Sequence, residues 1–499
     1  MGRRLDVRRL ARRVGGGAPN LQTGLRSRPE GLDSAAVRGV LELGLRIGES
    51  MLALGASAVD VTQAIRTVIR AFGLHGTQID LTFTAMTVSY DRGGDELPVT
   101  MMRIVRDRIP DYGRLQRVVE LAQDVADAPV PPEQAMERLE DAHTRLDRIV
   151  TAPQTYQRWV ITVALSAMAG AIAVLLGGTF PVMLVAAATT AAIDRVVWAL
   201  GRRGLPPFFL QAAGAGVAAL VAVALYLAVP HLPIDPSLLP PSLVVASGIV
   251  VLLAGLSLVG AAEDAISGFP ITAAARSFEV VVLTLGIVVG ITGVLDLARR
   301  LGVPLVLFDP PTATSHAVVR TAAAAVVALG WAVASYARPR AAFVAAGIGA
   351  VSWTVLTTVS GLGAGPAVAS AAAALVVGFL SEWASPRLKV QSIVTSVCGI
   401  VPLLPGLAIY RGLFDIVSNT STGILPGFAE LFGAMMIGLG IAGGVTLGEF
   451  LGAPLRLGTK GGGRSRSTAM RGVTQKNLRQ LRRRRAVPTT ERIGQPPSS

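Results

Sequence analysis

The chain has 499 residues, of which 51% are hydrophobic and only 16% are charged. Soluble globular domains usually carry about 25% charged residues, and the mean hydropathy of this chain is +0.55. These values exclude an ordinary soluble enzyme and a mainly disordered protein, and they indicate a membrane protein with many spans. The single cysteine, Cys398, excludes an intramolecular disulfide and a cysteine-based metal site.

The first 33 residues are rich in arginine and predict a disordered segment. They contain no apolar run of the kind that a secretory signal needs, so we expect the amino terminus to stay in the cytoplasm. Residues 34–150 predict a cytoplasmic α+β domain. Its first helix is expected at 35–54, and the spacing of Ser57 and Asp60 is that of a capping box that begins a second helix.

The next part of this domain has strand patterns. Alternating apolar residues over 79–89 predict one half-buried strand, with a bulge near residues 85 and 86 where the alternation shifts by one position. Residues 92–95 are typical of a turn, and 98–105 can return as a second strand. Helices near 113–127 and 132–149 are expected to close the domain.

Ten apolar windows follow, each about as long as a helix that crosses the hydrocarbon of a membrane. They lie at 159–177, 181–200, 208–229, 243–262, 279–298, 317–336, 341–359, 365–382, 390–409 and 427–450. The apolar stretch at 303–308 is too short to cross. Lys and Arg residues of the loops favour an orientation with both termini in the cytoplasm. In that orientation the cytoplasmic loops hold seven of these residues and the outer loops hold three. The inside set is Arg202, Arg203, Arg276, Arg338, Arg340, Arg387 and Lys389, and the outside set is Arg299, Arg300 and Arg411.

The ten windows divide into two five-helix halves, 151–302 and 303–455. Halves with five spans each and a shared fold lie in opposite orientations, which is the inverted repeat of many secondary transporters. Each half has a proline followed six positions later by an arginine, and a glutamate at the start of its glycine-rich fifth window. These residues are Pro270, Arg276 and Glu279 in the first half and Pro405, Arg411 and Glu430 in the second. We expect most glycines of the windows to serve helix packing.

Ionisable residues within the windows are candidates for a substrate and proton pathway, because a charge in hydrocarbon is costly. Helix breaks are candidates too, since they expose backbone groups that can hold ions or substrate. The candidate pathway residues are Asp194, Glu263, Asp264, Gly268, Pro270, Arg276, Glu279, Pro402, Pro405, Gly406, Arg411 and Glu430. Three ordinary interpretations stay open: Asp194 pairs with Arg195, residues 263–270 form an acidic cytoplasmic loop, and Arg411 anchors the chain at the interface. Glu449 could relay protons or fix a helix end.

Catalytic motifs are absent from the sequence. The four histidines lie far apart, and neither a zinc-protease HExxH motif nor a nucleophile-elbow GxSxG motif occurs. A phosphate-binding loop is missing as well, so the chain is not itself an ATP-driven pump. We therefore expect no cofactor and no metal, and transport that uses an ion or proton gradient.

Several separated segments together resemble the bacterial threonine/serine exporter family. The resemblance covers about 34–452 and rests on residues 45–57, 79–89, Asp194 with 201–209, 263–268, 272–276 and 401–414. It implies an exporter of threonine and serine in the cytoplasmic membrane, driven by the proton motive force. The amino-terminal domain of this family has been likened to hydrolases. In this chain no convincing catalytic triad is found, and Ser57 and Asp60 are better explained as a helix cap. Relatives that are split into two proteins are associated with succinate export, which makes a dicarboxylate the alternative substrate.

Two readings from other classes stay open, a membrane-anchored hydrolase and a scaffold or sensor. An amino acid needs a cation and an anion at its site, which Arg276 or Arg411 with Asp194, Asp264 or Glu279 could supply. The tail at 456–499 holds 12 of the 46 Lys and Arg residues, with Glu491 as its only acid. We expect it to be disordered and to meet anionic lipid rather than nucleic acid. The sequence leaves open whether the chain forms a homo-oligomer.

Overall fold

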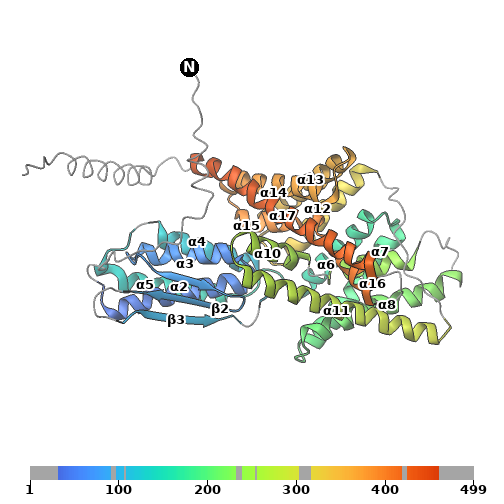
Figure 1. The fold of residues 1–499 in the computed structure, drawn as a ribbon, viewed down its shortest axis with the longest axis horizontal. Coiled ribbons are helices and arrows are strands. Elements are labelled where there is room, and N and C mark those ends of the chain that lie inside the picture. Colours follow the sequence, from blue (N-terminus) through green and yellow to red (C-terminus); the bar gives the residue numbers. More distant parts are fainter. Residues whose placement is uncertain are drawn as a thin grey trace, which may run out of the picture.

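The protein is described from a computed structural model, which places residues 32–459 except 92–96, 106–107, 128, 232–238, 253–254, 303–315 and 418–423. Four predictions fall wholly or mostly outside these residues: the arginine-rich segment at 1–33, the turn at 92–95, the apolar stretch at 303–308 and the basic tail. Figure 1 shows an α/β unit at one end of a bundle of long helices.

The α/β unit, here called the amino-terminal domain, packs helices on one side of an antiparallel sheet with strand order β1-β2-β3 (Figure 1). Its helices are α2 (Ser34–Ala53), α3 (Ala58–Ala71), α4 (Tyr112–Ala126) and α5 (Ala135–Thr151), with a 3-10 turn η1 (Pro132–Gln134) before α5. Its strands are β1 (Gln78–Leu81), β2 (Ala85–Tyr90) and β3 (Val99–Ile104). The four helices lie within two residues of their predicted bounds, apart from the 3-10 turn that replaces the first residues of the last.

The prediction of one bulged strand over 79–89 is wrong. β1 and β2 form a hairpin in which Leu81 lies opposite Met86. Backbone hydrogen bonds join Thr82 and Ala85 in both directions, at 2.8 and 3.2 Å, and close the turn between them. The shift in alternation therefore marks a reversal of the chain. A bulge and a two-residue turn both shift the apolar positions by one, so the pattern alone does not separate them.

Eight helices are long and apolar enough to cross a membrane within the described ranges, so the chain is a multi-pass membrane protein. They are α6 (Arg158–Leu175), α7 (Phe180–Gly201), α8 (Pro207–Ala228), α11 (Pro270–Arg300), α12 (Ala317–Ala334), α13 (Pro339–Gly361), α14 (Pro366–Leu388) and α17 (Ile424–Thr459). A short 3-10 turn η2 (Val229–His231) extends α8. α11 begins nine residues earlier than predicted, so Glu279 lies in its third turn and not at its start.

The fourth and ninth windows are interrupted, and the break in the ninth lies at the prolines that predicted it. The fourth is α9 (Pro241–Val250) and α10 (Gly255–Ile266), bent by 48° at the break. The ninth is α15 (Ser392–Gly399), a 3-10 turn η4 (Val401–Leu403) and α16 (Gly406–Val417). In the ninth window the cause is visible in the sequence, because Pro402 and Pro405 have no N–H to continue a helix.

The two halves have corresponding helix contacts. The corresponding packed pairs are α6–α7 and α12–α13, α7–α8 and α13–α14, α8–α11 and α14–α17, and α10–α11 and α16–α17. Across the halves, α6 packs on α12, and α10 contacts α17 as α16 contacts α11. Two copies of one unit related by a two-fold axis have this reciprocity, which supports the division into five and five.

Glycines bring the fifth helix of each half against the third, which agrees with the expectation that they serve helix packing. A Cβ at Gly444 would lie 2.3 Å from the Ala371 carbonyl oxygen, and one at Gly448 would lie 2.1 Å from that of Leu375. In the first half, a Cβ at Gly290 would lie 2.1 Å from the carbonyl oxygen of Ala212. These distances leave no room for a side chain, so backbones touch directly along α14–α17 and α8–α11.

The amino-terminal domain is docked firmly on the membrane helices. Its hydrophobic core continues into α12, α13 and α15, and includes Ala332, Ala341 and Val394. The Tyr112 N–H of the domain donates to the Ser335 carbonyl at 2.8 Å. In the connection from α5 to α6, the Tyr156 hydroxyl donates to the Ala337 carbonyl at 2.9 Å. A shared core and backbone hydrogen bonds fix the orientation of the domain, so residues from both parts can form one site.

Candidate functional site

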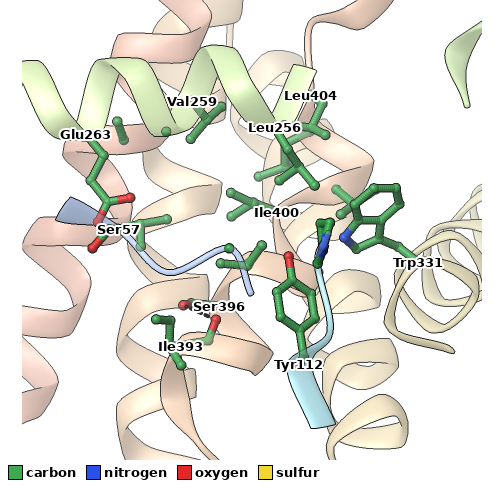
Figure 2. Close-up of a pocket in the computed structure, with 18 of the residues that line it drawn as sticks. Ser57, Tyr112, Leu256, Val259, Glu263, Trp331, Ile393, Ser396, Ile400 and Leu404 are labelled. Atoms are coloured by element: carbon green, nitrogen blue, oxygen red, sulfur yellow. Dashed lines mark hydrogen bonds between the residues drawn. The ribbon is translucent and has the colours of Figure 1, made fainter. Parts of the chain in front are cut away.

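A cavity of about 1330 Å³ lies between the amino-terminal domain and both halves of the helix bundle. Its walls come from α2, α3 and α4 of the domain and from the membrane helices α6 and α9 to α17. Figure 2 shows residues from several of these elements, among them Ser57 of the α3 cap, Glu263 of α10 and Ser396 of α15, around the same space. The cavity reaches as far as Leu176, at the end of α6 that is remote from the domain.

The cavity is charged at the domain end and apolar farther in. Its charged lining residues are the acids Asp60, Asp127, Glu263, Glu279, Glu382 and Glu449 and the bases Arg108 and Arg276. Beyond them the walls are formed by residues such as Ile172, Trp353 and Leu356. A polar ligand therefore meets charged groups near the amino-terminal domain before it reaches the apolar part.

The first turn of α3 meets a carboxylate from the membrane helices. Ser57 caps α3 as predicted: the Asp60 N–H donates to the Ser57 hydroxyl at 3.3 Å, and that hydroxyl donates to the Asp60 carboxylate at 2.7 Å. The Ala58 N–H donates to Asp264 of α10 at 3.3 Å, across 206 positions of sequence. A carboxylate at a helix N-terminus is favourable because free N–H groups and the helix dipole both attract it.

Arg276 of α11 is held by α10. Its guanidinium lies 3.1 Å from the carboxylate of Asp264, which is fully buried. A Cβ at Gly260 would lie 2.8 Å from the guanidinium nitrogen, so the glycine leaves the space that the arginine occupies. Gly260, Glu263 and Arg276 all line the cavity. Asp264 thus fixes a guanidinium at the wall beside the carboxylate of Glu263, which points toward Ser57 in Figure 2.

The two helix breaks meet at the inner part of the cavity. Val250, Val251 and Gly255 line it from the first half, and residues 400–406 line it from the second. A Cβ at Gly255 would lie 3.2 Å from the Cβ of Leu404, so the breaks are in contact. α10 and α16 both begin here, and starts of broken helices provide partial positive charge toward a ligand.

Comparisons with known proteins agree with this architecture. The family model described as "Putative threonine/serine exporter" matches residues 42–298, and the one described as "Threonine/Serine exporter, ThrE" matches 320–451. A Mycobacterium tuberculosis protein named "Probable threonine/serine exporter" is 38% identical over 444 residues, which are 87% of this chain and 80% of that protein. The "Threonine/serine exporter" of Corynebacterium glutamicum is 34% identical over 427 residues, 85% of this chain and 84% of that protein.

The chain belongs to the threonine/serine exporter family. No solved structure matches it. The boundary between the two family models falls between α11 and α12, which is also the boundary between the two halves.

In this exporter-family chain, six of the twelve predicted pathway residues line the cavity. They are Glu263, Arg276, Glu279, Pro402, Pro405 and Gly406. Asp264 lies directly behind Arg276 and acts on it. Gly268, with a φ of 89°, and Pro270 form the tight turn from α10 to α11. Glu263 and Asp264 are helical, so the interpretation of 263–270 as a loop holds only for its last residues.

The other three predicted residues are not among those that line the cavity. Asp194 is 8% exposed and pairs with Arg158 of α6 and with Arg195 at 2.7 Å, so it joins α6 to α7. Glu430 is exposed on α17, and Arg411 lies on α16. For Asp194 the structure favours the ordinary interpretation, a charge paired with neighbouring arginines.

Five charged residues of the cavity were missed or given other roles from sequence, and Asp127 of the domain is one of them. Asp60 was assigned to a helix cap, Glu382 lies at the edge of a predicted span, and nothing in the sequence singled out Arg108. Glu449 was recognised as ionisable but was not placed in the pathway; it lies beside Ser396 of α15. Among the described residues, no group of His, Cys, Asp and Glu is arranged to hold a metal ion.

The pH dependence of stability is expected to change in Asp60→Asn. Burial raises the pKa of the Asp60 carboxyl, the hydrogen bond from Ser57 opposes this, and the charges of Glu382 and Asp264 add to it. The folded state therefore binds this proton more tightly than the unfolded chain. The resulting stability is present below the ordinary aspartate pKa and is lost as the pH rises through the raised value.

Thermal midpoints in detergent should show that Asp60→Asn becomes more stable relative to the unmodified protein as the pH rises from 5 to 8. Glu263 and Glu449, with Arg108 and Arg276, face the same space and are common to both proteins. The charge of Asp60 acts on both of these acids, so the difference reports residue 60 together with its coupling to them. Asp80→Asn, at an exposed position of β1, is the control and should show a constant difference. A difference that does not vary with pH in Asp60→Asn would contradict the assignment.

Proposed function

We propose that the chain is a secondary transporter that exports threonine and serine across the bacterial cytoplasmic membrane, driven by the proton motive force. One observation carries this proposal beyond family membership: a single cavity between the two halves has guanidinium and carboxylate groups at one end. Both relatives are named as threonine/serine exporters. Their coverage includes the amino-terminal domain and both halves.

The charged end of the cavity suits a zwitterion. A carboxylate of the substrate can accept hydrogen bonds from the planar guanidinium of Arg276, and its ammonium group can be held by Glu263 from the neighbouring helix α10. The ion pair with Asp264 keeps Arg276 in place when the site is empty. The same carboxyl groups can carry protons, since carboxylates that share a confined site do not all ionise together.

The orientation follows from the position of the amino-terminal domain. The charge bias of the loops favours a cytoplasmic position for this domain, and the charged end of the cavity adjoins it. Substrate would therefore enter the charged end from the cytoplasm, as export requires.

The balance of charge argues against a dicarboxylate. The cavity is lined by six acids and two arginines, so a dicarboxylate would meet more carboxyl groups than cations there. A hydrolase is disfavoured because Ser57 is engaged with Asp60 and the α3 backbone. Among the described hydrogen bonds of Ser57, none involves a histidine.

Reconstituted transport separates these alternatives. In liposomes with an imposed pH gradient, we expect the purified protein to move labelled threonine and serine, and an uncoupler should abolish accumulation. Labelled succinate, measured in the same vesicles, should not move. Movement of succinate alone would replace the substrate, and movement that is indifferent to the uncoupler would remove the proton coupling.

A further inference from the structure

The amino-terminal domain lines the charged end of the cavity together with the membrane helices. Asp60 and Arg108 come from this domain, whereas Glu263 and Arg276 come from α10 and α11. Each part thus contributes one guanidinium and at least one carboxylate to the same space. Neither part alone contains the complete set.

Arg108 is fixed in position by its own domain. Its guanidinium lies over the ring of Phe83, with its carbon 4.1 Å from the ring centroid, and it donates a hydrogen bond to the Phe83 carbonyl. The next residue, Ile109, donates its N–H to the Ala53 carbonyl at 2.9 Å. The side chain is partly buried and lines the cavity. A cation held in this way is available to a ligand without first being ordered.

Arg108 and Arg276 lie close enough to influence each other. Burial lowers the pKa of Arg108 to about 10, and the charge of Arg276 contributes to the decrease. The guanidinium of Arg108 therefore stays charged at neutral pH, and the charge of Arg276 repels it. Glu279 and Asp264 offset part of this charge, and a carboxylate from a ligand would offset more.

Asp60 faces Glu263 across the boundary between the two parts. Its charge acts on both Glu263 of α10 and Glu449 of α17, and Glu382 of α14 acts on it in return. The Ser57 hydroxyl holds the Asp60 carboxylate at 2.7 Å, so the acid keeps a fixed orientation. An ammonium group is a cation that such a set of acids can bind.

The docking contacts keep these residues in register. The Ala58 N–H to Asp264 hydrogen bond joins α3 to α10, and the Thr272 hydroxyl of α11 donates to the Leu81 carbonyl at 3.4 Å. Asp264 also holds Arg276 at 3.1 Å. One buried carboxylate therefore contacts both the domain that carries Asp60 and the arginine of the membrane helix.

We propose that the amino-terminal domain forms half of the amino-acid binding site, with Asp60 binding the ammonium group of the substrate beside Glu263 and Arg108 binding its carboxylate beside Arg276. This inference rests on the proposed function and extends it. The domain then takes part in substrate recognition. Its removal would leave Glu263 without Asp60 and Arg276 without Arg108.

The test uses the full-length protein and threonine analogues that each lack one charge. Threonine counterflow is measured in liposomes, with competition by 2,3-dihydroxybutyrate, which lacks the ammonium group, and by threoninol, which lacks the carboxylate. Asp60→Asn should lower the affinity for threonine and threoninol by about tenfold or more, and the affinity for 2,3-dihydroxybutyrate much less. Arg108→Gln should lower the affinity for threonine and 2,3-dihydroxybutyrate by a similar factor, and the affinity for threoninol much less.

The controls are Asp80→Asn and Arg66→Gln, at exposed positions of the same domain, which should leave all three affinities unchanged. The ratio of the two analogue affinities does not depend on how much protein folds, so poorly folded variants still give a result, and Asp60→Glu should retain the wild-type ratio. An unchanged ratio in both Asp60→Asn and Arg108→Gln, with threonine still transported, would overturn the inference alone. Failure of the unmodified protein to move threonine would overturn the proposed function and the inference together.

Discussion

Arg276→Ala is expected to destabilise the protein strongly and to abolish threonine transport. The substitution leaves Asp264, which is fully buried, without the guanidinium that lies 3.1 Å away. Removing one partner of a buried ion pair typically costs about 3–5 kcal/mol, because the remaining charge stays buried and uncompensated. The measurement is the thermal midpoint in detergent, together with counterflow in liposomes.

A double variant separates the two roles of Arg276. Asp264→Asn with Arg276→Gln removes both charges, so it should recover much of the lost stability while transport stays absent. Arg300→Ala on the same helix is the matched control, because both side chains of its ion pair with Asp296 are exposed. Exposed ion pairs contribute little to stability. Normal transport in the double variant would show that Arg276 supports only the fold.

Gly444→Ala is expected to damage the packing of α14 against α17, whereas Gly443→Ala is not. The new methyl carbon at position 444 would lie 2.3 Å from the Ala371 carbonyl oxygen, so the two backbones must separate. Overpacking of this kind costs about 1–3 kcal/mol, and more where neither backbone can move. At Gly443 a Cβ meets nothing within 4 Å, and alanine favours a helix over glycine.

Thermal midpoints and the yield of monodisperse protein measure this difference. The two variants make the same chemical change at adjacent positions, so composition and helix propensity cancel in the comparison. Equal midpoints for the two variants would contradict the close approach of α14 and α17.

The membrane helices could be predicted well because their signal is local. A run of about 20 apolar residues predicts a span, and the prolines at 402 and 405 predict a break, without any knowledge of neighbours. The glycine-rich fifth windows indicated close helix packing for the same reason. The hairpin of β1 and β2 was predicted as one bulged strand, because a two-residue turn and a bulge shift the alternation of apolar residues in the same way.

The composition of the cavity was harder to predict because it depends on contacts between distant segments. Asp60 fits a local motif, the cap of α3, so nothing in the sequence indicated that it also lines the cavity. Arg108 is one of many arginines in the chain, and only the docking of the domain places it near Arg276. Asp194 pairs with Arg158 of a neighbouring helix, and the sequence alone gives no sign of this contact.

The direct backbone contacts of α14 with α17, and of α8 with α11, also limit how the molecule can move. A helix pair whose glycines rest on carbonyl groups cannot slide without collision, so each pair moves as a rigid block. Alternating access between the two sides of the membrane would then preserve both blocks and change the contacts of α10 with α17 and of α16 with α11. Spin labels on α14 and α17 should keep one separation in both states, whereas labels on α10 and α17 should report two.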